Sequence, residues 1–140
     1  MEAENLRIEY FEKGAVHLSK KEKQKQGAVY TPRELAEYMA RLLDLKERKP
    51  ILDPCVGYGQ LLAAVMNTYD FIEYEDLYGI DIDEEAIKFC IEKFPGGHFQ
   101  VGDILVDDYT DDAFWEKNPF EKYEPFKLKS GFNFGDFSKN

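Results

Sequence analysis

A chain of 140 residues is long enough for one domain, and its 44% hydrophobic and 15% aromatic content excludes disorder across the whole chain. The formal net charge of −10 opposes nonspecific binding to nucleic acid. No apolar run is long enough for a membrane span and no signal peptide opens the chain, so we expect no membrane partner. Cys55 and Cys90 form no CxxC pair and no disulfide framework, so we expect a cytoplasmic protein.

The first 26 residues are expected to form a segment outside the main domain. Residues 1–18 show a weak helical pattern through Leu6, Tyr10 and Phe11. The sequence SKKEKQKQ at 19–26 is locally basic. It fits a solvated linker, and it also fits an arm that contacts phosphates; the sequence leaves both interpretations open.

The sequence TPRELAEYMARLLDL predicts a strong helix. Thr31 can cap it, Pro32 suits the first helical position, and Glu34 completes a capping box. Apolar residues follow at helical spacing and make one stripe. The stripe consists of Leu35, Tyr38, Met39, Leu42 and Leu43.

Alternating strand and helix signals continue to residue 105. Short apolar runs at 51–52, 77–82 and 98–105 predict strands, and two amphipathic segments between them predict helices. Asp83 is a plausible cap of the second of these helices. This order indicates an α/β fold with parallel strands and right-handed crossovers. From Val106 onward the pattern deteriorates, and no strand is predicted there.

The sequence ILDPCVGYGQLL places Gly57 and Gly59 between the first strand and its helix. In an open α/β sheet this position lies beside the ligand. A dinucleotide motif needs a third small residue, where this chain has Leu62, and no Walker tripeptide occurs. A ligand with a carboxylate therefore fits better than a pyrophosphate.

Three acids end the three strands: Asp53, Asp81 and Asp103. Asp81 follows Gly59 by 22 residues (81 − 59), and Asp103 follows Asp81 by 22 (103 − 81). A carboxylate after the second strand can accept both ribose hydroxyls, and one after the third can accept from an adenine amine. Aspartate at a strand end is also ordinary turn chemistry. Three acids in register with the glycine turn favour a nucleoside site.

The segments GAVYTP, ILDPCVGYGQLL, LYGIDIDEEAI and VGDIL resemble, in this order, those of N6-adenine DNA methyltransferases of type I and type IIG restriction–modification systems. The resemblance covers about residues 27–105. It implies a partial Rossmann-like, class I S-adenosylmethionine-dependent methyltransferase sheet with flanking helices. It also implies a cofactor pocket for S-adenosylmethionine, lined by Tyr30, Thr31, Pro32, Asp53, Pro54, Gly57, Gly59, Asp81, Ile82, Asp103 and Ile104.

The catalytic part of this resemblance is weaker. After a fourth strand, such enzymes carry a four-residue motif: Asn or Asp, then two prolines, then Tyr or Phe. This chain offers Asn118, Pro119 and Phe120, with one proline missing. A functional catalytic loop and a turn of chance likeness are the two interpretations. Tyr58 also replaces the usual serine of the turn, where its ring could narrow the turn or stack on the ligand.

After Asp103 only 37 residues remain (140 − 103), too few for four further strands. We therefore expect a sheet truncated after the third or fourth strand, with residues 27–105 as the cofactor-binding domain and 106–140 as an acidic and aromatic tail. The free edge of the first strand would need the tail, a second copy or a partner chain to cover it.

Two functions remain. One is the cofactor-binding portion of an adenine-N6 DNA methyltransferase, with DNA contacted largely through a missing or separate recognition region. The other is an inactive module that binds S-adenosylmethionine or serves as an interaction piece of a restriction–modification system.

Overall fold

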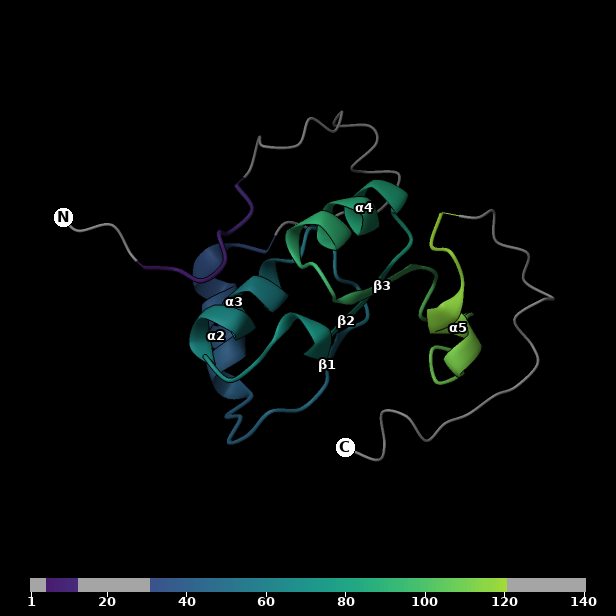
Figure 1. Cartoon of the computed structure of the whole chain (residues 1–140). Coiled ribbons are helices and arrows are strands. Elements are labelled where there is room, and N and C mark those ends of the chain that lie inside the picture. The colour runs from purple at the N-terminus through teal and green to yellow at the C-terminus, as the bar shows by residue number, and fades with distance from the viewer. Residues whose placement is uncertain (1–4, 13–30, 121–140) are drawn as a thin grey trace.

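The computed structural model describes residues 5–12 and 31–120 (Figure 1). Helices and strands alternate along the second of these ranges, as the sequence predicts. The elements are α2 (Arg33–Leu42), β1 (Ile51–Asp53), α3 (Gln60–Thr68), the 3₁₀ helix η1 (Tyr74–Asp76), β2 (Leu77–Asp81), α4 (Glu84–Lys93), β3 (His98–Val101) and α5 (Asp112–Glu116).

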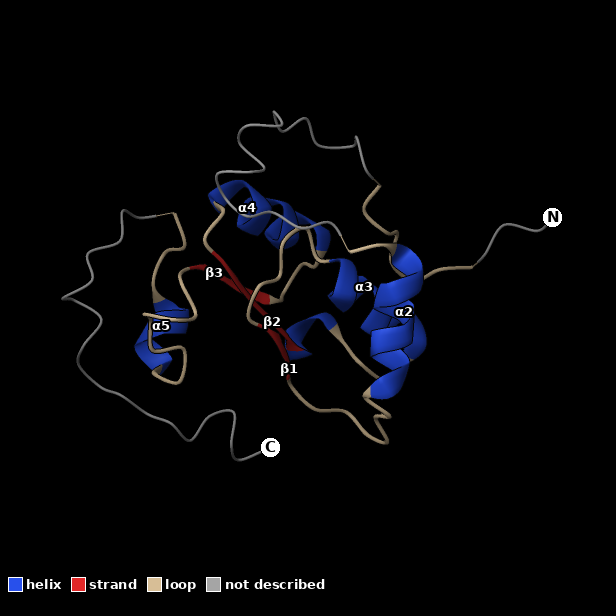
Figure 2. Cartoon of the chain, turned by 180° about the vertical axis from the view of Figure 1, so that it is seen from behind, coloured by secondary structure: helices blue, strands red, loops and turns tan. Residues whose placement is uncertain are grey.

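The three strands form one parallel sheet in the order β1-β2-β3 (Figure 2). Leu52 pairs with Tyr78, and Gly79 pairs with Phe99. This arrangement confirms the predicted fold class, a partial Rossmann-like sheet with flanking helices. Within the described residues β1 has a single strand neighbour, so its other edge is free.

The main core lies between the sheet and helices α3 and α4. Phe94 at the end of α4 packs on Phe99 of β3, with ring centroids 5.8 Å apart. Each such fully buried apolar side chain contributes about 1.5–3 kcal/mol. Asp83 caps α4 as predicted, because its carboxylate accepts the N–H of Glu85 at 3.0 Å. The core also includes Leu62, Val65, Leu77, Ile87 and Cys90.

A short helix, α5, contacts β3 and was not predicted. Its first turn is capped by Asp111, which accepts the N–H of Ala113. The Gln100 side chain ties α5 to the sheet by donating to the carbonyls of Trp115 and Lys117 at 3.0 and 2.8 Å. Gln100 is 3% exposed, so these bonds are made in a site shielded from water.

Helix α2 differs from its prediction in two ways. It begins at Arg33, with Pro32 in an extended conformation as the N-cap and no side-chain cap bond, so the capping box of Thr31 and Glu34 does not form. Only Ala36 and Ala40 of this helix are buried, and the helix packs on α3. The apolar stripe of Leu35, Tyr38, Met39, Leu42 and Leu43 is instead exposed.

Residues 5–12 do not form the helix that their pattern suggested. They lie against α3 through hydrogen bonds to main-chain groups. The Asn67 amide accepts from Ile8 N–H at 2.9 Å and donates to Ile8 C=O at 2.8 Å. The Gln60 amide does the same for Phe11, at 2.8 and 3.2 Å. These side chains supply the hydrogen bonds that a helix would otherwise have supplied.

Arg7 adds a third anchor, at the C-terminal end of α3. Its guanidinium donates to the carbonyls of Met66, Tyr69 and Ile72 at 2.9–3.0 Å. A cation at a helix C-terminus satisfies carbonyls that have no partner within the helix and complements the helix dipole. None of the described helices is long and apolar enough to cross a membrane.

Replacing Asn67 with alanine tests this anchoring. Asn67→Ala leaves the N–H and C=O of the buried Ile8 without their partner, which costs about 1–3 kcal/mol of unfolding free energy. Urea denaturation measures the loss, and limited proteolysis reports release of residues 5–12. Thr68→Ala, at an exposed neighbouring position, is the matched control. Equal stability of the two variants would contradict the anchoring.

Candidate cofactor site

The turn between β1 and α3 has left-handed backbone at both glycines. Gly57 has φ +54° and Gly59 has φ +81°. Both conformations are unfavourable for residues with a Cβ atom. The two positions differ in their surroundings. A Cβ on Gly59 would lie 2.5 Å from the Phe94 ring, whereas a Cβ on Gly57 would meet nothing within 4 Å. Gly59 thus serves packing, and Gly57 leaves open space beside the turn.

Asp81, at the end of β2, holds this turn in place. One carboxylate oxygen accepts the N–H of Gly57 at 2.8 Å, and the other accepts the N–H of Asp83 at 2.8 Å. The Val56 N–H also donates to the Ile80 carbonyl at 2.9 Å. The turn, the end of β2 and the start of α4 are therefore joined through one side chain.

The three predicted acids lie at the carboxyl edge of the parallel sheet, where Asp53 ends β1, Asp81 ends β2 and Asp103 follows β3. The Gly102 N–H, next to Asp103, donates to the Asp81 carbonyl at 3.0 Å. Burial raises the pKa of the Cys55 thiol, and the nearby carboxylates of Asp53, Asp81 and Asp103 raise it further. A thiol with a raised pKa is a poor nucleophile at neutral pH. The groups at this edge that can bind a ligand are therefore the carboxylates and the main-chain N–H and C=O groups.

Two of the acids are held in an environment that disfavours their charge. Burial raises the pKa of Asp53, and the charge of Asp81 adds to the rise, although the N–H of Cys55 opposes it. Burial also raises the pKa of Asp81, against the bonds it accepts from Asp83 and Gly57. A cation bound at this edge would relieve both penalties.

Asp103 is positioned by a residue that sequence reasoning missed. The carboxylate of Asp107, 9% exposed, accepts the Asp103 N–H at 2.7 Å, and the Asp107 N–H donates to the Asp103 carbonyl at 2.8 Å. One carboxylate oxygen of Asp103 accepts the Leu105 N–H at 2.9 Å. The spacing of the two aspartates, four residues apart in a loop, was the available signal, but such spacing is common in turns.

Apolar side chains border the acids. Ile82 directly follows Asp81 and is 56% exposed, and Ile104 follows Asp103 and is half-buried. Leu105 and Val106 are exposed as well. Carboxylates next to exposed aliphatic groups provide both kinds of surface that a nucleoside needs, which are acceptors for hydroxyls or amines and a face for the base.

Tyr58 stacks on a protein ring in this structure. Its ring lies parallel to Phe11 with centroids 4.8 Å apart, and it meets Phe89 edge to face at 5.2 Å. Its buried hydroxyl has no hydrogen-bond partner among the residues that the structure describes. Burial, with the charges of Asp83 and Glu85, raises the pKa of Tyr58 to about 12. The ring thereby joins the turn to the N-terminal segment.

The other predicted site residues are placed as follows. Thr31 and Pro32 lead into α2, and Pro54 is an exposed residue of the turn. Tyr30 lies outside the described residues. Asn118, Pro119 and Phe120 follow α5, the helix that packs on β3. The Asn118 side-chain oxygen accepts the N–H of Phe120 at 3.0 Å, so one of its acceptor positions is used within the turn.

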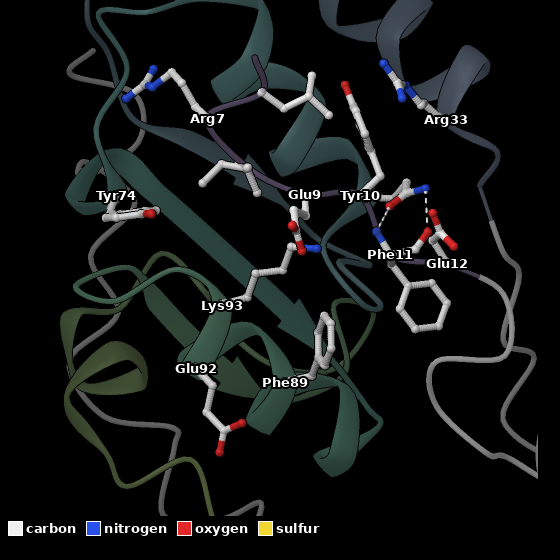
Figure 3. A pocket seen from close by; sticks show the side chains of 13 residues that line it. Arg7, Glu9, Tyr10, Phe11, Glu12, Arg33, Tyr74, Phe89, Glu92 and Lys93 are labelled. Carbon is white, nitrogen blue, oxygen red and sulfur yellow. Dashed lines mark hydrogen bonds between the residues drawn. The ribbon is translucent and has the colours of Figure 1, made fainter. Parts of the chain in front are cut away.

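A groove of about 1080 Å³ lies elsewhere, between the N-terminal segment and α4 (Figure 3). Arg7 through Glu12 form one wall, and Phe89 and Lys93 belong to the other. None of the three strand-end acids lines it. We place the candidate site at the acids because ligands of open α/β sheets bind beyond the carboxyl ends of the strands. No cluster of metal ligands occurs among residues 5–12 and 31–120.

The sequence model of the N-6 DNA methylase family matches residues 9–94, more than half of the chain. The chain belongs to this family. The match includes the glycine turn, β2 with Asp81, and α4. A relative, the ribosomal RNA small subunit methyltransferase H of Coprothermobacter proteolyticus, is 40% identical over 62 residues, which are 44% of this chain and 20% of that protein. The aligned part of this chain thus covers about a fifth of the relative's length.

The two glycines of the turn give a matched stability test. Gly57→Ala places a Cβ in left-handed backbone and costs about 1–2 kcal/mol. Gly59→Ala carries the same backbone cost and also drives its Cβ into Phe94, which adds about 1–3 kcal/mol. Thermal and urea unfolding measure the difference. A Gly59 variant as stable as the Gly57 variant would contradict the packing role.

Removing the Asp53 charge should stabilise the fold near neutral pH. The pKa of Asp53 in the folded protein lies above its ordinary value of 3.8. The unfolded chain therefore releases this proton at a lower pH than the folded protein, and Asp53 lowers the unfolding free energy as pH rises. Asn in place of Asp53 keeps the acceptor for Cys55 N–H and removes this loss. The stability advantage of Asp53→Asn should grow from pH 3.5 to pH 7, measured by urea unfolding. Asp70→Asn, at an exposed position, is the control.

Proposed function

We propose that the chain forms the S-adenosylmethionine-binding portion of an adenine-N6 DNA methyltransferase. Membership of the N-6 DNA methylase family supports this proposal. The observation that carries it is the position of Asp53, Asp81 and Asp103 at the carboxyl ends of adjacent parallel strands, beside a turn with open space at Gly57. The rest of a methyltransferase, including the part that recognises DNA, would come from outside these 140 residues.

The donor set fits S-adenosylmethionine on chemical grounds. The ligand carries two positive charges, on its sulfonium and its ammonium group, and Asp53 and Asp81 are carboxylates whose pKa values are raised by burial. Each oxygen of Asp81 accepts one main-chain N–H and retains a lone pair for a ribose hydroxyl. Ile82 offers an exposed aliphatic face for the adenine ring.

When bound, S-adenosylmethionine supplies a methyl group made electrophilic by its sulfonium sulfur. The chain's own part is to orient this group: Asp53 and the glycine turn would hold the methionine end, and Asp81 the ribose. Asp103, held by Asp107, would accept from the adenine amine of the cofactor. Hydrogen bonds within the protein already hold the glycine turn, Asp81 and Asp103. This order would reduce the conformational entropy lost on binding.

Transfer also requires an acceptor for the N–H of the target amine. In our proposal the Asn118 side-chain oxygen accepts that hydrogen bond and Phe120, 43% exposed, stacks on the flipped base. Held in this way, the N6 lone pair would face the methyl group that S-adenosylmethionine supplies, and the N6 proton would leave to solvent. For this role the Asn118 oxygen would use the lone pair that the Phe120 N–H leaves free, or would exchange that bond.

A second candidate function is a binding module without catalysis. One observation favours it: a single proline follows Asn118, where the resemblance leads us to expect two. The nearby relative acts, by its name, on ribosomal RNA, so a nucleic acid other than DNA is a further acceptor to test.

Calorimetric titration with S-adenosylmethionine tests the shared part of both proposals. We expect micromolar binding by the full chain and at least about tenfold weaker binding by Asp81→Asn, since one acceptor and the charge are lost. Asp70→Asn is the control, and circular dichroism checks that the variants remain folded. A folded wild-type chain that does not bind the cofactor overturns both candidate functions.

Transfer of a labelled methyl group separates them. The enzyme proposal expects incorporation into adenine N6 of duplex DNA, reduced about 100-fold or more by Asn118→Ala with unchanged cofactor affinity. Cofactor binding without incorporation, when the chain is assayed together with the DNA-recognising part, favours the binding module. Incorporation into ribosomal RNA in place of DNA would overturn the DNA assignment while keeping the methyltransferase.

A further inference from the structure

The outward face of α2 carries an apolar patch that the fold does not use. Its five side chains are 40–65% exposed, although they stand at the spacing of an amphipathic helix. The buried side of the helix consists of Ala36 and Ala40, which let α2 lie close to α3. The patch consists of Leu35, Tyr38, Met39, Leu42 and Leu43.

Such a patch is unlike ordinary surface exposure. A single exposed leucine is common, because folded proteins cannot cover all apolar surface with polar groups. Five large apolar residues within nine consecutive positions of one helix make a contiguous surface, and contiguous surfaces of a few hundred Å² mark interaction sites. In Figure 1, α2 lies at the side of the molecule away from α5, so the described residues leave this face accessible.

Charges beside the patch indicate what covers it. Glu34 lies in the first turn of α2 and Arg41 in its last, and both are exposed. They are seven residues apart, which is close to two turns, so both lie on the same flank of the patch, next to Tyr38. One flank therefore has an acid at one end and a base at the other. When a second copy of the helix lies antiparallel to the first, each acid faces a base.

We propose that a second copy of this chain covers the patch, with the two α2 helices antiparallel about a two-fold axis. The midpoint of Leu35 and Leu42 falls between residues 38 and 39, and that of Glu34 and Arg41 between 37 and 38. One axis near residue 38 therefore brings the apolar patches together and sets Glu34 of one copy beside Arg41 of the other, twice. A two-fold interface requires this kind of self-complementarity.

The net charge of −10 opposes association of two copies, so the apolar contact must overcome a long-range repulsion. Salt screens that repulsion within about 8–10 Å at ordinary ionic strength. Dimerisation should therefore strengthen when salt is raised from 20 to 150 mM, which is the opposite of what an assembly held only by ion pairs would do.

Sedimentation velocity of the full chain across micromolar to millimolar concentrations tests the proposal. We expect a reversible monomer–dimer equilibrium, weakened at least about tenfold by Leu42→Lys. Ile91→Lys, at a residue 36% exposed on α4, is the matched control and should leave the equilibrium unchanged. A wild-type chain that stays monomeric at all concentrations, or a Leu42 variant that dimerises normally, overturns the proposal.

A charge exchange distinguishes a second copy from any other partner. Glu34→Arg and Arg41→Glu alone each set like charges against each other across the axis and should weaken the dimer about fivefold to tenfold. The double variant restores opposite charges at both places and should recover most of the affinity. Lys88→Glu, exposed on α4, is the control. If the double variant is as weak as the single ones, the antiparallel arrangement is wrong.

Discussion

The carboxylate of Asp81 is the constraint on which the candidate site depends. It accepts one N–H from Gly57 in the turn after β1 and another from Asp83 at the start of α4, so segments 26 residues apart in the chain (83 − 57) meet at one side chain. Burial raises the pKa of this group, yet the fold keeps it at the sheet edge. Ligand-binding sites often retain such locally unfavourable charges, because the ligand supplies the compensation.

A second set of contacts supports the turn from the opposite side. Tyr58, within the turn, stacks on Phe11, and the main chain of Phe11 is held by Gln60 at the start of α3. The thiol of Cys90, fully buried in α4, donates to the Gly57 carbonyl at 3.3 Å. The turn is thus fixed by three neighbouring elements, and the open space beside Gly57 remains where none of them reaches.

The sequence was sufficient for the strand–helix order, the Asp83 cap and the glycine turn, because these depend on local patterns that tertiary contacts reinforce. The sequence was insufficient where side chains distant along the chain determine the local structure. Residues 5–12 have helical spacing, but Asn67 and Gln60 bind their main chain in a non-helical form. The α2 stripe resembles a core face, but a pair of alanines packs instead. These choices depend on tertiary contacts, and so does the position of Asp107 against Asp103.

The way α3 binds the N-terminal segment has a consequence for register. Asn67 and Gln60 are seven residues apart, or about 10.5 Å along a helix, and the chain from Ile8 to Phe11 reaches about 10 Å at full extension. Main-chain groups are the same at every non-proline residue, so the amides alone would accept a chain shifted by one position. Such a shift would take Ile8, 5% exposed, out of its buried position and remove Arg7 from the end of α3. The amides therefore supply the attachment, and the side chains of Arg7, Ile8 and Phe11 determine which residues are attached.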